Sequence, residues 1–246
     1  GARSLDHIHQ NQVILVEDNQ QLNGLIVGNI LLAPYHFTRG MRNREEKETR
    51  MLTQFGTYNL GKLTNKHVTK FTMMDLVALT LPPTFQARRK LKCFRPPREG
   101  ERAMLVTMQY EKAGWVAKQS GKSHITPFGD LHGGLWKHRI STGPGDCGSA
   151  IVAVTDLKVV GFHNLGGKGE NYFTPITIEV MDFLAEKSVT PLVPWKFSDE
   201  QVDLCGLIAA NGADKYPFTK TISDLVSWQS LQMTKYCGEN FKAIAY

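Results

Sequence analysis

The segment Gly145-Asp146-Cys147-Gly148-Ser149-Ala150 leads directly into the apolar run Ile151-Val152-Ala153-Val154. Glycine permits the tight turns that point consecutive N–H groups toward one spot. Such N–H groups stabilise an oxyanion while a neighbouring sulfur attacks a carbonyl carbon. We therefore predict that Cys147 is a nucleophile at the entrance to a buried strand.

A second apolar run, Val159-Val160-Gly161-Phe162, ends on a histidine, His163. Short apolar runs bounded by turn residues are typical of buried strands. A strand that ends on a polar ring close to a nucleophile can help to form a pocket for a substrate side chain. Together the two runs predict the nucleophile and the specificity pocket of a trypsin-like cysteine protease.

The composition is that of a folded chain with free thiols. The 246 residues are 41% hydrophobic and 21% charged, which allows one large core or two smaller ones and argues against extensive disorder. No stretch has the pattern of a transmembrane helix or of a secretion signal. A chain of this size without a secretion signal is expected to keep its thiols reduced. The spacing of the cysteines is not that of metal ligands, and the expected chemistry requires neither a metal nor an organic cofactor; the cysteines are Cys93, Cys147, Cys205 and Cys237.

The net charge of +6 and the pI near 9.1 raise the question of a polyanionic partner. Basic residues cluster at Arg88-Arg89-Lys90, Lys92, Arg95 and Arg98. No aromatic stacking motif accompanies them, so we interpret the cluster as a solvated basic face with nonspecific RNA binding as a secondary property. A pure RNA-binding module is the alternative to an enzyme.

Short strands dominate the rest of the chain, and we predict an all-β fold, either a barrel or a sandwich. Helical periodicity is confined to residues 176–187. The predicted strands lie at Val13–Val16, Gly24–Val27, Ile30–Leu32, Leu76–Leu79, Ala103–Met108, Ile151–Val154, Val159–Phe162 and Tyr172–Phe173.

A nucleophilic cysteine needs a base, and His36 is the best candidate among eight histidines. It follows the apolar run Ile30–Ala33, where the end of a buried strand could deliver it to a cleft. His67 is the rival, in a polar neighbourhood only eight residues before the best acid. The remaining histidines are interpreted as surface or structural residues: His7, His9, His124, His132 and His138.

Asp75 is the predicted orienting acid, because it directly precedes the apolar run Leu76–Leu81. A carboxylate there can hold an imidazole in one tautomer and stabilise its protonated form. The chain order histidine, aspartate, nucleophile is that of chymotrypsin-type enzymes. A serine hydrolase using Ser149 is a second rival, but this serine lies past the glycine loop, within the strand entrance.

These residues, with several further motifs, resemble the nuclear inclusion a (NIa) proteases of the potyvirus family, which are related to the picornavirus cysteine proteases and to chymotrypsin. The resemblance extends from about Gly24 to about Leu225. It rests on Trp136–Thr142, Gly145–Ser149, Val160–His163, Asn171–Thr174, Lys92–Pro97 and Asp75 with its following strand.

The resemblance implies a chymotrypsin-like double β-barrel with the active site in the cleft between the domains. It places an N-terminal barrel at residues 1–109, a connection and the start of the second half at 110–134, and a C-terminal barrel at 135–220. Residues 221–246 would form an extension. The tail from Gln229 could be a flexible segment, a self-cleavage region or a strand in the substrate cleft.

The resemblance also implies the chemistry. The triad falls on His36, Asp75 and Cys147, and the reaction passes through a thioester. The N–H groups of Gly145 and Cys147, with Asp146 beside them, would form the oxyanion hole.

The resemblance further implies cleavage after glutamine, whose side-chain amide would be read by Thr142 and His163. A neutral histidine of fixed tautomer beside a hydroxyl matches the donor and acceptor of that amide. The implied substrates are viral polyprotein sites with glutamine before the scissile bond. The implied precursor partners are VPg and other viral proteins, in the cytoplasm and the nucleus of an infected cell.

The chain departs from the family pattern around the nucleophile. Pro144 stands where many members carry an acidic residue, and Ala150 replaces a common proline. The loop between His163 and Asn171 looks about two residues shorter than usual. These differences leave the predicted triad in place and predict an altered cleavage consensus.

Overall fold

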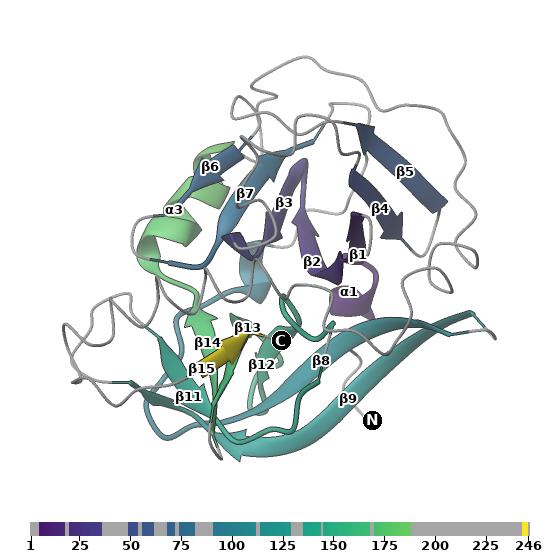
Figure 1. Cartoon of the computed structure of the whole chain (residues 1–246). Coiled ribbons are helices and arrows are strands. Elements are labelled where there is room, and N and C mark those ends of the chain that lie inside the picture. The colour runs from purple at the N-terminus through teal and green to yellow at the C-terminus, as the bar shows by residue number, and fades with distance from the viewer. Residues whose placement is uncertain are drawn as a thin grey trace.

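The protein folds into two antiparallel β-sheets, one above the other in Figure 1. The computed structural model describes residues 5–17, 20–35, 49–53, 56–61, 68–71, 74–81, 91–111, 114–128, 135–143, 145–167, 170–187 and 243–245.

The first sheet has the order β5-β4-β1-β2-β3-β7-β6. Its strands are β1 (Gln12–Glu17), β2 (Gln20–Val27), β3 (Ile30–Ala33), β4 (Thr49–Thr53), β5 (Gly56–Gly61), β6 (Val68–Lys70) and β7 (Val77–Thr80). The short helix α1 (Asp6–His9) precedes it.

The second sheet has the order β10-β11-β14-β13-β12-β8-β9, with β15 paired to β13. Its strands are β8 (Arg102–Glu111), β9 (Gly114–His124), β10 (Thr126–Pro127), β11 (Trp136–His138), β12 (Ala150–Ala153), β13 (Val159–Gly167), β14 (Glu170–Pro175) and β15 (Ala243–Ala245).

The uninterrupted apolar runs of the sequence are strands buried on both faces. In β3, Leu31 packs with the interior of the first barrel, whereas Ile30 and Leu32 pack in a layer shared between the barrels. In β12, Ile151 packs inside the second barrel and Val152 in the shared layer. Successive side chains of a strand point to opposite faces, so both faces must be apolar when both are covered.

The predicted helix is confirmed as α3 (Ile178–Lys187). The Thr177 hydroxyl accepts a hydrogen bond from the N–H of Val180 at 3.3 Å, which satisfies one of the free N–H groups of the first turn. The helix returns to the first barrel, beside β6 and β7 in Figure 1, where Phe183 packs edge-on against Phe71 at 5.3 Å between ring centroids.

The division between the barrels differs from the sequence-based boundaries. Strand β8 pairs with β12, with Leu105 opposite Ile151, so residues 102–109 belong to the second sheet and not to the first. The hairpin partner β9 covers much of the predicted connection at 110–134. An apolar strand fits either barrel equally well, and only its long-range pairing assigns it to one.

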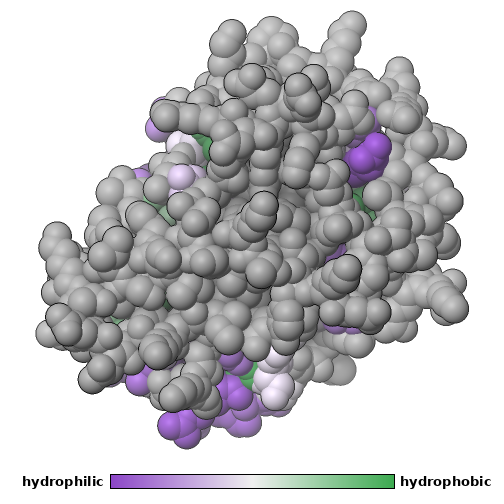
Figure 2. Space-filling view, in the orientation of Figure 1, coloured by the Kyte–Doolittle hydropathy of each residue, from purple (hydrophilic) through white to green (hydrophobic). Residues whose placement is uncertain are grey.

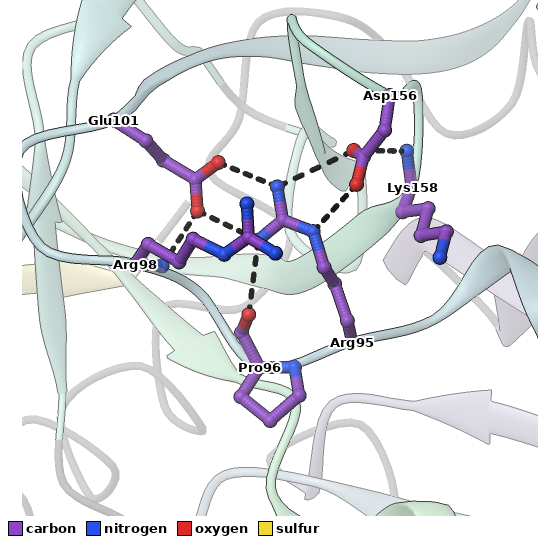
Figure 3. Close-up of polar contacts among 6 residues, drawn as sticks. All are labelled: Arg95, Pro96, Arg98, Glu101, Asp156 and Lys158. Carbon is purple, nitrogen blue, oxygen red and sulfur yellow. Dashed lines mark hydrogen bonds and ion pairs between the residues drawn. The ribbon is translucent and has the colours of Figure 1, made fainter.

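The segment before β8 is fixed to the second barrel by a buried arginine (Figure 3). The Arg95 guanidinium donates to Glu101 at 2.6 and 2.8 Å and, through Nε, to Asp156 at 2.8 Å. Burial alone would raise the pKa of the Glu101 carboxyl, but hydrogen bonds from Arg95 and from the backbone of Arg98 lower it below its ordinary value. The network ties residues 95–101 to the turn between β12 and β13.

Replacing Arg95 by methionine is expected to lower the free energy of unfolding by about 3 kcal/mol, because Glu101 and Asp156 would be left partly buried without a countercharge. Urea titration followed by circular dichroism measures the loss. Arg98→Met is the matched control, since the Arg98 side chain is exposed and the hydrogen bond of Arg98 to Glu101 comes from its backbone N–H. Equal stability losses in the two variants would contradict the prediction.

The described surface carries few large apolar side chains. In the view of Figure 2 the most extensive hydrophilic patch lies at the lower edge, over the second sheet, and smaller ones lie at the upper left and upper right. Among the described residues, Ile178 is the large hydrophobic side chain that is exposed, at 63%. The large apolar side chains of the described strands are therefore buried in the cores.

Candidate active site

The predicted nucleophile lies on a tight loop between β11 and β12. Gly145 and Gly148 have φ values of +89° and +83°, the left-handed region that side chains disfavour. The loop closes on itself: the Asp146 N–H donates to the Gly143 carbonyl at 3.2 Å, and the Asp146 carboxylate accepts from the Gly143 N–H at 2.9 Å. The glycine pattern thus produces the turn that it predicts.

A side chain from the first sheet holds this loop. Asn23 of β2 donates from its backbone N–H to the Cys147 carbonyl at 2.8 Å and from Nδ2 to the Gly145 carbonyl at 3.1 Å. Its Oδ1 accepts from the Met108 N–H at 3.0 Å. The nucleophile loop is therefore anchored across the junction of the two barrels.

The Cys147 side chain is buried at this junction. It is 0% exposed and packs with the core of the first barrel, although its loop belongs to the second sheet. The thiol donates to the Asn164 carbonyl of β13 at 3.4 Å. Cys147 therefore contacts elements of both barrels.

Two parts of the predicted triad can be placed. Asp75 is 2% exposed and lies two residues before Val77, which pairs with Ala33 at the end of β3. Pro34, the next residue after β3, lies 3.1 Å from where a Cβ on Gly148 would stand. The end of β3, the start of β7 and the nucleophile loop thus converge.

Both candidate bases, His36 and His67, lie outside the described residues. His36 is the second residue after Pro34, so it follows the segment that reaches the nucleophile loop. Val68, which follows His67, pairs with Leu79, toward the end of β7 away from Asp75. The strand pairing therefore favours the choice of His36.

The two predicted pocket residues lie beside the loop. His163 is 0% exposed on β13, and its carbonyl accepts from the Gly148 N–H at 2.8 Å while its N–H donates to the Ser149 carbonyl at 3.0 Å. The hydroxyl oxygen of Thr142 is buried and makes no hydrogen bond within the described part of the chain. A buried hydroxyl without a partner is costly and is a candidate contact for a substrate.

The Asp146 N–H does not have the position expected for the third donor of the predicted oxyanion hole. Its N–H is already used by the Gly143 carbonyl, so Gly145 and Cys147 are left as the predicted donors. The rival nucleophile is also engaged, because the hydroxyl of Ser149, which is 0% exposed, donates to the Thr107 hydroxyl at 2.8 Å.

Two residues of the site were not singled out by sequence reasoning. Asn23 is a polar residue between Leu22 and Gly24, at the start of the apolar part of β2, which could have marked it as a buried hydrogen-bonding group. His138, interpreted as a surface or structural histidine, is 1% exposed, and its Nε2 lies 3.0 Å from Nδ1 of His163. Only the pairing of β11 with β14 and of β14 with β13 brings these rings together.

Asn23→Ala is expected to lower the free energy of unfolding by about 2 kcal/mol and to reduce kcat about tenfold, since it frees the Gly145 carbonyl and the Met108 N–H. Urea unfolding and peptide cleavage rates measure the two effects. The matched control is Asn29→Ala, in the turn between β2 and β3, because neither side-chain polar atom of Asn29 makes a hydrogen bond among the described residues. A kcat loss no larger than that of the control would refute the positioning role of Asn23.

The described residues offer neither a metal cluster nor a membrane-spanning helix. They contain no group of three or more histidine, cysteine, aspartate or glutamate residues that could hold a metal ion. No described helix is both long enough and apolar enough to cross a membrane.

Solved structures share this fold. Tobacco etch virus protease complexed with product superposes with a TM-score of 0.67 at 24% identity, covering 82% of this chain and 86% of that one. Tobacco vein mottling virus protease gives a TM-score of 0.64 at 21% identity, covering 82% and 91%. The expected chymotrypsin-like double β-barrel is confirmed.

Sequence relatives are genome polyproteins of plant viruses. That of Brome streak virus (strain 11-Cal) is 52% identical over 245 residues, which is 100% of this chain and 8% of the polyprotein. That of Triticum mosaic virus is 26% identical over 244 residues, 96% of this chain and 8% of the polyprotein. The chain thus spans less than a tenth of these relatives. The model of peptidase family C4 matches residues 1–223, and the chain therefore belongs to this family, the NIa-type cysteine proteases of the potyvirus family.

Proposed function

We propose that this chain is the endopeptidase that processes a viral polyprotein after glutamine residues, with Cys147 as nucleophile, His36 as base and Asp75 as orienting acid. The observation that carries the proposal is the placement of the thiol on a glycine loop held between the barrels, beside the strand of His163. Family membership supports the reaction class, and the relatives support a polyprotein as substrate.

The proposed reaction uses these side chains, two backbone N–H groups of the nucleophile loop and water. The proton of the Cys147 thiol passes to His36, and the thiolate attacks the scissile carbonyl carbon. The N–H groups of Gly145 and Cys147 stabilise the resulting oxyanion. The C–N bond breaks as His36 protonates the leaving amine, and water, deprotonated by His36, then hydrolyses the thioester and restores the thiol.

The glutamine preference rests on Thr142 and His163. The Thr142 hydroxyl is buried and His163 is a buried ring, so a substrate amide would supply hydrogen bonds where water is excluded. A site that hydrogen-bonds a polar group discriminates strongly against side chains that lack it. Glutamate would bring a buried charge without a countercharge.

A panel of junction peptides that differ only in the residue before the scissile bond tests the specificity. With glutamine, glutamate, asparagine, leucine and lysine at that position, kcat/KM should be at least about 100-fold higher for glutamine. Mass spectrometry of the products locates the cut. A comparable rate for another residue, or a cut elsewhere, would refute the glutamine preference.

The edge of β13 beyond His163 is suited to an extended peptide. Ala243–Ala245 pairs there antiparallel to Leu165–Gly167, with Ile244 opposite Gly166. Backbone pairing at a sheet edge is a common mode of peptide recognition. Of the three alternatives for the tail, this pairing favours a strand beside the proposed pocket.

Removing residues 240–246 is therefore expected to lower KM for a peptide substrate about fivefold or more, because the segment no longer competes for the edge of β13. The change in kcat should be smaller, since the proposed catalytic residues are untouched. Initial-rate kinetics of the full and shortened chains make the comparison. An unchanged KM would exclude competition by the tail.

RNA binding is not part of the proposal. Arg95, one of the clustered basic residues, is bound to Glu101 and Asp156, and Arg88–Lys90 lie outside the described residues. The proposed precursor partners are neighbouring segments of the polyprotein, VPg among them.

A further inference from the structure

His138 and His163 form a buried pair of rings behind the proposed glutamine pocket. The His138 ring lies on β11 and the His163 ring on β13, with 5.2 Å between centroids in an edge-on arrangement. Nε2 of His138 lies 3.0 Å from Nδ1 of His163. On the far side of the first ring, Nδ1 of His138 accepts the backbone N–H of Ile140 at 3.1 Å.

This chain of contacts fixes where the protons lie. A backbone N–H can only donate, so Nδ1 of His138 must carry a lone pair, and the proton of the neutral ring is on Nε2. That N–H then donates to His163, whose Nδ1 must be the acceptor. The proton of a neutral His163 therefore lies on Nε2.

The same contacts keep both rings neutral. A proton on Nδ1 of His138 would point at the Ile140 N–H, and a proton on Nδ1 of His163 would point at the His138 N–H. The two rings are 1% and 0% exposed, so water cannot compensate a charge there. Burial lowers the pKa of His138 to about 4, in agreement with a neutral ring near neutral pH.

We propose that His138 is a positioning residue for specificity: its Nε2–H fixes the proton of His163 on Nε2, so that the pocket presents a neutral donor to the amide oxygen of glutamine. This inference rests on the proposed function of His163. The backbone N–H of Ile140, two residues before Thr142, sets the direction of these hydrogen bonds, because it can only donate to Nδ1 of His138. The selectivity for glutamine over glutamate then depends on His138, a residue that lies behind the pocket and acts on the substrate only through His163.

The tautomer is directly measurable in the wild-type chain. Long-range proton–nitrogen spectra of the ¹⁵N-histidine-labelled protein distinguish a protonated ring nitrogen from an unprotonated one. The expected result is Nε2 protonated and Nδ1 unprotonated in both His138 and His163 near neutral pH. A protonated Nδ1 on either ring would overturn the proposal, whatever the substrate preference.

Two variants of His138 test its effect on specificity. His138→Phe keeps a ring and removes the donor, and it is expected to lower the glutamine-to-glutamate ratio of kcat/KM at least about tenfold. His138→Gln retains an N–H donor near the position of Nε2 and should restore most of the ratio. His124→Phe is the control, because His124 is an exposed ring on the same sheet, and its Nδ1 lies 2.9 Å from the Gly100 carbonyl, away from His138 and His163 in the sequence.

The outcomes separate this inference from the proposed function. If the wild-type enzyme does not prefer glutamine, the proposed function fails, while the nitrogen spectra still decide the tautomer. If the enzyme prefers glutamine and folded His138→Phe keeps both the ratio and the His163 tautomer, the positioning role is refuted. If His138→Phe does not fold, the wild-type spectra decide: protons on Nε2 of both rings support the role, and a proton on Nδ1 of either ring refutes it.

Discussion

Cys147→Ala is expected to abolish peptide cleavage, with kcat reduced by a factor of roughly 10⁴ or more. The proposed nucleophile is the Cys147 sulfur, and a methyl group cannot form the thioester. Cys147→Ser should retain weak activity, because a hydroxyl in the same place is a poorer nucleophile at neutral pH. Cleavage of a glutamine junction peptide, followed by chromatography, measures all three enzymes.

The control for this prediction is the other described cysteine. Cys93 lies in η3 (Leu91–Cys93) and is half-buried, whereas Cys147 is buried at the junction of the barrels. Cys93→Ala should cleave at the wild-type rate, since its sulfur belongs to the segment that joins the barrels. Undiminished cleavage by Cys147→Ala would remove the proposed mechanism altogether.

Gly148→Ala is expected to prevent stable folding, at a cost of more than about 4 kcal/mol. A Cβ at this position would stand 1.8 Å from the Asn23 carbonyl oxygen and 2.8 Å from its carbon. Both are backbone atoms of β2, where Asn23 pairs with Ile14 of β1 and donates its N–H to the Cys147 carbonyl, so they cannot move away without breaking these contacts. The φ of +83° adds the strain of a left-handed conformation.

Gly100→Ala separates the two causes. Gly100 has a φ of +78°, yet no atom lies within 4 Å of a Cβ built there. This variant should lose only the conformational part, about 1–2 kcal/mol. Urea unfolding of both proteins gives the comparison, and similar midpoints would show that the approach of Asn23 does not constrain Gly148.

Much of the fold was predictable because a buried strand is encoded by a short run of consecutive apolar residues. The runs Ile30–Leu32 and Ile151–Val154 are apolar at every position. Ile30–Leu32 and Ile151–Ala153 proved to be strand residues covered on two faces, whereas Val154 lies in the turn after β12. The helix at residues 176–187 followed from its periodicity. The barrel to which Ala103–Met108 belongs could not be predicted in this way. The run pairs with β12, which is distant in the sequence, and an apolar strand fits either sheet.

The candidate site divides in the same way. The glycines around Cys147 predicted a tight loop with left-handed residues, since only glycine adopts that backbone without strain. The buried hydroxyl of Thr142 and the ring of His163 were expected in the pocket from the family resemblance. The engagement of the Asp146 N–H with Gly143 was not expected, because it depends on how the loop closes.

The nucleophile loop, the apolar strands and the family motifs can be read from the order of residues, since each depends on neighbours in the chain. The contacts of Asn23 with the loop and of His138 with His163 cannot, because they join residues that sequence separates and sheet pairing brings together. Hydrogen bonds act only over about 3 Å. The packing of the two barrels therefore decides which backbone groups of the loop Asn23 binds and which ring nitrogens of His138 and His163 carry protons.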